Sequence, residues 1–360
     1  MSTLVFSIPT FNITIPVPEG TSDHGNPSIL CTPTNWTSIL SFFFGNYIAH
    51  AATTLASPGE ELFEYALAVV MVLLFPSAGV DRGLDAIFRC AVFAKDDLTR
   101  AARAGALCMV IRTDEQNQKI PAGADAQSVV ICTSQQTAKL LVAVWQTLYG
   151  AATLYRARGD QLARYGYAAF ALTVIPYTVM SIVNLLGALL TPSYPTMYLV
   201  RSEVMDELDD GPEPYFDGTV GVLEPAVGEQ AEQQVPLNRP YRFLPDPGDT
   251  ALLIVLTVSV GIPLAIIGGL TKFKPGNSTH SQRVWLMMWL GFGSLGALFS
   301  RIPIVMAELL QLPFVRFYST IIPTIPNILL ISLVYSVPAI GGMVVVGKMI
   351  KEYGDCIRFD

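Results

Sequence analysis

The chain has 360 residues, of which 51% are apolar and only 14% are charged. Ordinary soluble domains carry about 25% charged residues, so this composition is typical of a membrane protein. The net charge is −7 and there is no basic tract, which argues against nucleic acid as a partner. The five cysteines lack metal-ligand spacing, and the sequence contains no phosphate-binding loop, so we expect no metal and no other cofactor.

Three long segments contain no charged side chain: Tyr167–Leu190, Ala251–Thr271 and Phe317–Gly347, with 24, 21 and 31 residues. A helix of about 20 apolar residues crosses a hydrocarbon core about 30 Å thick. The sequence therefore predicts an all-α fold, a polytopic transmembrane helix bundle of about seven or eight spans. The expected spans are Trp36–Ala56, Leu62–Val80, Ala138–Tyr155, Tyr167–Leu190, Ala251–Leu270, Val284–Ser300 and Tyr318–Val346.

Five parts follow one another along the chain. They are an N-terminal tail (1–35), a first membrane half (36–190), an acidic hydrophilic loop (191–250), a second membrane half (251–347) and a C-terminal tail (348–360). Within the first half, residues 81–112 mix basic and apolar side chains. This pattern is typical of an amphipathic helix at the membrane surface, or of a helix packed beneath the bundle.

The distribution of positive charge does not orient this bundle. With seven spans, eleven Lys and Arg residues fall on the side of the N-terminus and nine on the other. Asn12, Asn35 and Asn277 begin glycosylation sequons, and in this count the third falls on the side opposite the first two. An eighth element, within residues 81–111 or at Ile302–Val315, would change the sidedness. We expect an integral protein of the endoplasmic reticulum or another endomembrane.

Polar side chains within the expected spans are candidates for function, because they are costly at that depth. Asn46 and His50 are four residues apart, on one helix face. Glu64 can approach that face because the turn before its helix is short. A carboxyl in an apolar site can stay protonated and act as a general acid. The candidate catalytic residues are Glu64, His50, Asn46, Glu308 and Asp81.

A second group could line a substrate cavity. The aromatic rings of Tyr47, Tyr177 and Trp289 could stabilise a cationic species through their faces, although ordinary packing would also explain each of them. Asn184 and Arg301 are the polar candidates for the same cavity. For Asn46, His50 and Asn184, hydrogen bonding between helices is the alternative interpretation.

Several segments resemble a large set of fungal multi-pass membrane proteins. They are Asn46–Ala52, Ala101–Cys108, Leu154–Gln161, Tyr165–Phe170, Pro195–Leu199 and Phe216–Gly221. This set is similar to the membrane-bound terpene cyclases of meroterpenoid biosynthesis, of the ascochlorin, ascofuranone and macrophorin type. The resemblance implies a metal-independent isomerase or lyase. Its substrate would be a hydrophobic, prenylated small molecule, which protonation of a terminal epoxide or alkene would cyclise within the lipid bilayer.

Two other classes stay open. Glu and His side chains within a membrane also form proton relays, so a transporter or a small-molecule sensor of fungal secondary metabolism is the main alternative. The sequence lacks the internal repeat that is common in transporters. A structural scaffold is the third possibility, and the oligomeric state is left open.

Overall fold

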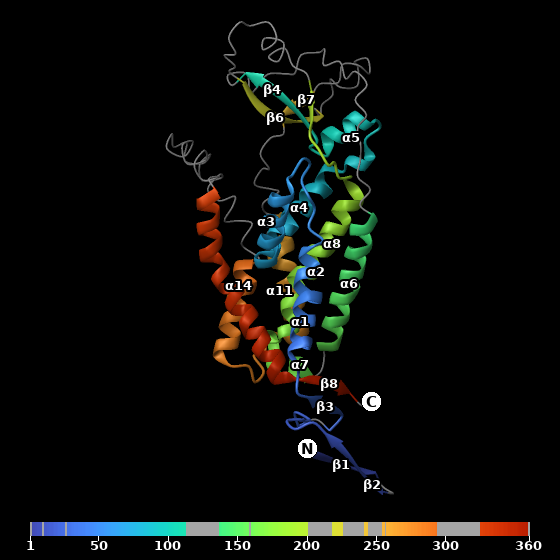
Figure 1. Cartoon of the computed structure of the whole chain (residues 1–360), viewed down its shortest axis with the longest axis vertical. Helices are drawn as coiled ribbons and strands as arrows, with labels where there is room; N and C mark the ends of the chain where they lie inside the picture. The colour runs from blue at the N-terminus through green and yellow to red at the C-terminus, as the bar shows by residue number, and fades with distance from the viewer. Residues whose placement is uncertain are drawn as a thin grey trace.

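The computed structural model describes residues 2–8, 11–25, 27–112, 137–157, 160–200, 218–225, 241–243, 254–255, 257–293 and 325–358. Of the described residues, 71% are helical. Figure 1 shows an elongated helical bundle with both chain termini at the same end. Glu308 and Arg301 lie outside the described residues, as does most of the acidic loop.

The helical elements follow one another along the bundle. In chain order they are α1 (Trp36–Phe43), η1 (Phe44–Ile48), α2 (Ala49–Ala51), α3 (Leu62–Leu74), α4 (Pro76–Arg89), η2 (Ala91–Phe93), α5 (Asp97–Arg103), α6 (Thr137–Ala157), α7 (Asp160–Tyr165), η4 (Gly166–Ala168), η5 (Phe170–Val174), α8 (Ile175–Leu190), η7 (Thr257–Gly261), α11 (Ile262–Thr271) and α14 (Ile325–Tyr353). Residues 280–293 are also helical.

Strands at both ends of the bundle add to the predicted helices. β1 (Ser2–Ile8) and β2 (Phe11–Val17) form an antiparallel hairpin, and β3 (Ile29–Thr32) pairs with β8 (Asp355–Arg358). We call this the disulfide end, because Cys31 of β3 is bonded to Cys356 of β8. At the other end, the sheet end, the strand order is β5 (Tyr198–Val200), β4 (Leu107–Arg112), β6 (Gly218–Pro225) and β7 (Tyr241–Phe243).

The loop after α11 lies at the disulfide end. The backbone N–H of Asn277 donates to the carbonyl of Arg164, whose side chain pairs with Glu352 at 3.3 Å, just before β8. Asn35, the residue before α1, lies at the same end. In the seven-span count Asn277 and Asn35 fell on opposite sides. That expectation is wrong, because the loop that carries Asn277 lies at the same end of the bundle as Asn35 and both chain termini.

The expected span Leu62–Val80 is broken in two. α3 ends at Leu74 and α4 begins at Pro76, with a bend of 119° between them. A proline lacks the N–H that would continue the helix, and it forces the preceding residue out of helical geometry. Phe75 accordingly has φ −133° and ψ 83°. The chain therefore turns back, and α4 packs along α8.

Two glycines allow α4 to pack closely on α8. A Cβ on Gly79 would overlap the sulfur of Met180, and one on Gly83 would lie 2.5 Å from Oδ1 of Asn184. This Gly-x-x-x-Gly spacing is the pattern by which helices approach each other in membranes. Residues 76–89 are thus part of the packed bundle.

One helical segment among the described residues, Phe170–Leu190, is long and apolar enough to cross a membrane. The bent pair formed by Leu62–Leu74 and Pro76–Phe93 is a second such segment if it is counted as one span. These one or two segments do not by themselves establish the seven or eight spans that the sequence predicts.

An ion pair closes the turn between α2 and α3. The guanidinium of Arg82 donates to both carboxylate oxygens of Glu60, at 2.8 and 3.0 Å, and to the carbonyl of Leu55. Burial alone would raise the pKa of Glu60. The hydrogen bonds from Arg82 and Ser57, together with the positive charge of Arg82, outweigh burial and hold that pKa below its ordinary value of 4.5.

We expect Arg82→Gln to lower the free energy of unfolding by about 1–3 kcal/mol, because it leaves a carboxylate with only 8% side-chain exposure without its cation. The folded-state pKa of Glu60 is depressed, so the pair stabilises the fold above the ordinary pKa. This contribution is lost as the pH falls through the folded-state pKa. Melting in detergent at neutral pH and at a series of lower pH values tests this, because the gap between variant and wild type should narrow as the pH falls. Arg100→Gln, which breaks the exposed pair with Asp97, is the control and should cost less than about 1 kcal/mol.

Candidate functional site

A row of buried polar side chains crosses the middle of the bundle. Nδ1 of His50 lies 2.7 Å from Oγ of Ser181 on α8, and Oγ1 of Thr53 lies 3.2 Å from the same oxygen. Nδ2 of Asn184 is 3.5 Å from Oγ1 of Thr53. His50 has 0% exposed surface, and its partners in this row are buried as well. The row therefore joins α2 and the turn after it to α8 through side-chain hydrogen bonds.

Asn46 joins the same face to α6. Its Nδ2 donates to the carbonyl of Phe42, and its Oδ1 accepts a bond of 3.0 Å from the hydroxyl of Thr153. Asn46 lies in η1, where the α-helical ladder widens into a π-helical turn. Such turns occur often at functional sites, because they re-aim side chains. Asn46 and His50, predicted to share one polar face, are both buried and hydrogen-bonded to neighbouring helices.

Two polar atoms of this row have no hydrogen-bond partner among the described residues: Nε2 of His50 and Oδ1 of Asn184. A glycine lies opposite each of them. A Cβ on Gly150 would lie 3.3 Å from Nε2, and one on Gly83 would lie 2.5 Å from Oδ1. An unpaired buried polar atom costs about 1–3 kcal/mol, so its retention points to a use for that atom.

Three aromatic rings pack together next to this row. The ring centroids of Tyr47 and Tyr177 are 5.1 Å apart, and that of Trp289 lies 5.3 Å from Tyr47 and 6.3 Å from Tyr177. Tyr47 donates or accepts a 2.6 Å bond with Thr173, and the hydroxyl of Tyr177 donates to the carbonyl of Leu73. The three aromatic residues predicted for a cavity thus form one cluster. Its π-faces can stabilise positive charge.

A cavity of about 470 Å³ leads from the disulfide end toward this region. Asn46 and Thr153 line it, and so do Asp355 and Cys356 of the disulfide end. The other lining residues are Ile29, Thr37, Ser38, Ser41, Phe42, Tyr149, Arg156, Ala157, Asp160, Gln161, Phe170, Ala171 and Tyr353. Its walls mix apolar rings with hydroxyl, amide and charged groups, which suits a ligand with a polar head and an apolar body.

Of the predicted acids, the two within the described residues do not lie in the buried row. Glu64 is exposed on α3, because the first turn of that helix points outward, and Asp81 is half-buried on α4. The expectation that Glu64 shares an apolar site with His50 is therefore not met. The buried carboxylate near the start of α3 is instead Glu60, which pairs with Arg82. Asn184, a candidate for the substrate cavity, lies in the row.

Several residues of the site were not predicted. Ser181, Thr53 and Thr153 are small hydroxyl residues, which also serve as ordinary helix-packing residues in apolar segments. The spacing of Ser181 and Asn184, three residues apart on one face of α8, is the signal that could have found them. Comparisons of the chain with protein-family models, curated proteins and solved structures found no match.

Proposed function

We propose that the protein is a multi-span integral membrane protein of an endomembrane. The support comes from the outer faces of the helices, where large apolar side chains are exposed. Trp145 on α6 has 66% exposed surface, and Val337 on α14 has 55%. Others on several helices are Leu40, Phe44, Phe63, Val70, Leu141, Leu148, Ile182, Leu186, Leu189, Ile262, Leu264, Met288, Ile340 and Val344. Apolar surface of this extent is unfavourable in water and favourable in lipid.

Within this bundle, the proposed activity is metal-independent cyclisation of a prenylated, epoxidised small molecule. The observation that carries it is the unpartnered Nε2 of His50 beside the aromatic cluster. Tyr47 precedes His50 by three residues and Tyr177 precedes Ser181 by four, so both rings lie one turn from the His50–Ser181 pair. The resemblance to fungal membrane-bound terpene cyclases favours the same chemistry.

The proposed reaction is an isomerisation. His50 first takes up a proton and then donates it from Nε2 to the epoxide oxygen, and the C–O bond breaks with its electron pair left on that oxygen. The π-electrons of a neighbouring alkene then attack the carbocation and close a ring. The aromatic faces of Tyr47, Tyr177 and Trp289 stabilise the cation as it moves. Loss of a proton from carbon to the neutral imidazole ends the reaction and restores the acid.

We place the polar head of the substrate in the cavity, which Asn46 and Thr153 line and His50 does not. Asn46 is four residues before His50, and Thr153 is three after Gly150, which faces Nε2. The Asn46–Thr153 pair therefore stands about one helical turn from the imidazole. A phenol ring held by this pair would place its prenyl chain toward the aromatic cluster.

Membranes of a host that expresses the chain test this function. They would be fed an epoxidised prenyl phenol, and the products would be analysed by chromatography and mass. We expect an isomer of unchanged mass that is absent from membranes of the empty host. Recovery of the substrate alone would refute the cyclase proposal. Saturable uptake of unchanged substrate into sealed vesicles would then favour a transporter.

A further inference from the structure

The two ends of the molecule differ in the chemistry of their cysteines. At the disulfide end, Cys31 and Cys356 are 325 residues apart in sequence and joined by an S–S bond. At the sheet end, Cys90 and Cys108 are free thiols. Disulfides form and persist in oxidising compartments, whereas the cytosol keeps thiols reduced.

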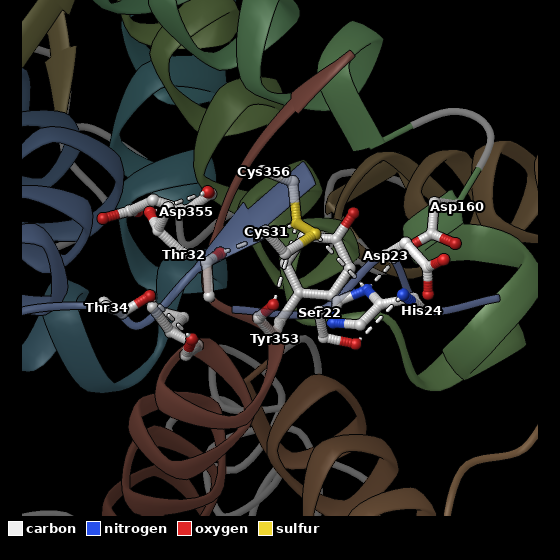
Figure 2. Close-up of a disulfide and its surroundings, with 12 residues drawn as sticks. Ser22, Asp23, His24, Cys31, Thr32, Thr34, Asp160, Tyr353, Asp355 and Cys356 are labelled. Atoms are coloured by element: carbon white, nitrogen blue, oxygen red, sulfur yellow. Dashed lines mark hydrogen bonds and ion pairs between the residues drawn. A yellow bond between two sulfur atoms is a disulfide. The ribbon is translucent and has the colours of Figure 1, made fainter. Parts of the chain in front are cut away.

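The disulfide belongs to a set of contacts that ties the two chain ends together. Nδ1 of His24 lies 3.1 Å from Oδ2 of Asp160 and 3.5 Å from the sulfur of Cys31. The rings of His24 and Tyr353 have centroids 5.2 Å apart. Figure 2 shows these side chains grouped around the S–S bond. The N-terminal loop, α7 and the end of α14 thus pack together around the Cys31–Cys356 disulfide.

The free thiols lie where the bundle meets the sheet. Cys90 ends α4, and its thiol donates to the carbonyl of Ile87. Cys108 is buried in β4 and lies 3.6 Å from the carbonyl of Tyr198 on β5. Ala91, Leu107 and Tyr194 join these two places in one small apolar core.

We propose that the disulfide end faces the oxidising lumen of the endomembrane and the sheet end faces the reducing cytosol. The sequons support this orientation, because Asn35 and Asn277 are exposed at the disulfide end and Asn12 lies on β2 of the hairpin there. Such sites receive glycans only in the lumen of the secretory pathway, so all three acceptors are on the side that the disulfide requires.

This orientation sets the side from which the cavity is filled. Asp355 and Cys356 line the cavity at the disulfide end, so its ligand enters from the lumenal half of the membrane. The statement that the ligand enters from the lumenal half rests on the proposed function, whereas the orientation of the bundle does not. Orientation is therefore tested by measurements that need no catalytic activity.

The first test uses glycosylation as a reporter of sidedness. The full chain would be expressed in a eukaryotic host and treated with an N-glycosidase, with the triple variant Asn12→Gln, Asn35→Gln and Asn277→Gln as the comparison. Adding Asp217→Asn to the triple variant creates an Asn-Gly-Thr sequon whose last two residues, Gly218 and Thr219, begin β6 of the sheet end. We expect a mass loss for the native chain and none for either variant. A glycan on the Asp217→Asn chain would overturn the orientation.

The second test uses the native cysteines, and it tests the orientation even if no sequon is glycosylated. Sealed microsomes would be treated with a membrane-impermeant maleimide, before and after detergent and a thiol reductant. We expect Cys90 to react in sealed vesicles. Cys31 and Cys356 should react only after both treatments. Labelling of Cys90 only after detergent, or Cys31 and Cys356 found as free thiols, would overturn the proposal, and Cys90→Ser identifies the reactive thiol.

Discussion

His50→Ala is expected to slow cyclisation of the epoxidised prenyl phenol by about 10²–10⁴-fold, the range typical of a lost general acid. The fold should survive the change, because the row keeps its bond between Thr53 and Ser181. The rate would be measured with purified protein in lipid nanodiscs, as isomer formed per unit time. Melting of the same samples separates lost chemistry from lost structure.

Two further variants sharpen this result. His50→Asn keeps a polar group that can bond Ser181 but has no atom in the place of Nε2, so its rate should fall as far as that of His50→Ala. His280→Ala removes an exposed histidine and should leave the rate unchanged. A His50→Asn variant with the native rate would remove the imidazole from the mechanism.

Gly166→Ala is expected to destabilise the protein by about 3 kcal/mol or more, because two costs combine at this position. Gly166 has φ +57°, a conformation that side chains with a Cβ rarely adopt. A Cβ there would overlap the carbonyl oxygen of Lys274 and lie 2.5 Å from the carbonyl carbon of Pro275. These are backbone atoms, which cannot rotate away. The measurement is thermal unfolding in detergent.

Gly25→Ala is the matched control for this prediction. Gly25 has φ +80°, but its Cβ would meet nothing within 4 Å. Its cost should therefore be only the conformational one, about 1–2 kcal/mol. Equal losses for the two variants would show that the contact between Gly166 and the 272–279 loop contributes nothing.

The sequence predicted those parts of the structure that depend on local pattern. Apolar runs predicted the helices around Trp36, Ala138 and Tyr167, and the spacing of Asn46 and His50 predicted one polar face. The aromatic cluster could be proposed, because each of its rings lies in an apolar segment. Its geometry follows from packing between η1, α8 and residues 280–293.

The sequence could not predict the features that depend on contacts between distant segments. The pairing of Cys31 with Cys356 joins residues 325 positions apart, and no local pattern encodes it. Pro76 signals a break, but not that α4 turns back along α8. The sequence could not show that Glu60, rather than Glu64, is the buried carboxylate, because this depends on where Arg82 lies in the fold.

The central claim is that the cavity between α1, α6 and β8 holds the prenylated substrate. A photoreactive epoxidised prenyl phenol, irradiated with the purified protein and mapped by peptide mass spectrometry, tests it most directly. We predict labels on Phe42, Asn46, Tyr149 and Thr153, which line the cavity, and loss of these labels when unlabelled substrate competes. Labels confined to the outward-facing Leu141 and Leu148, unaffected by competition, would contradict it.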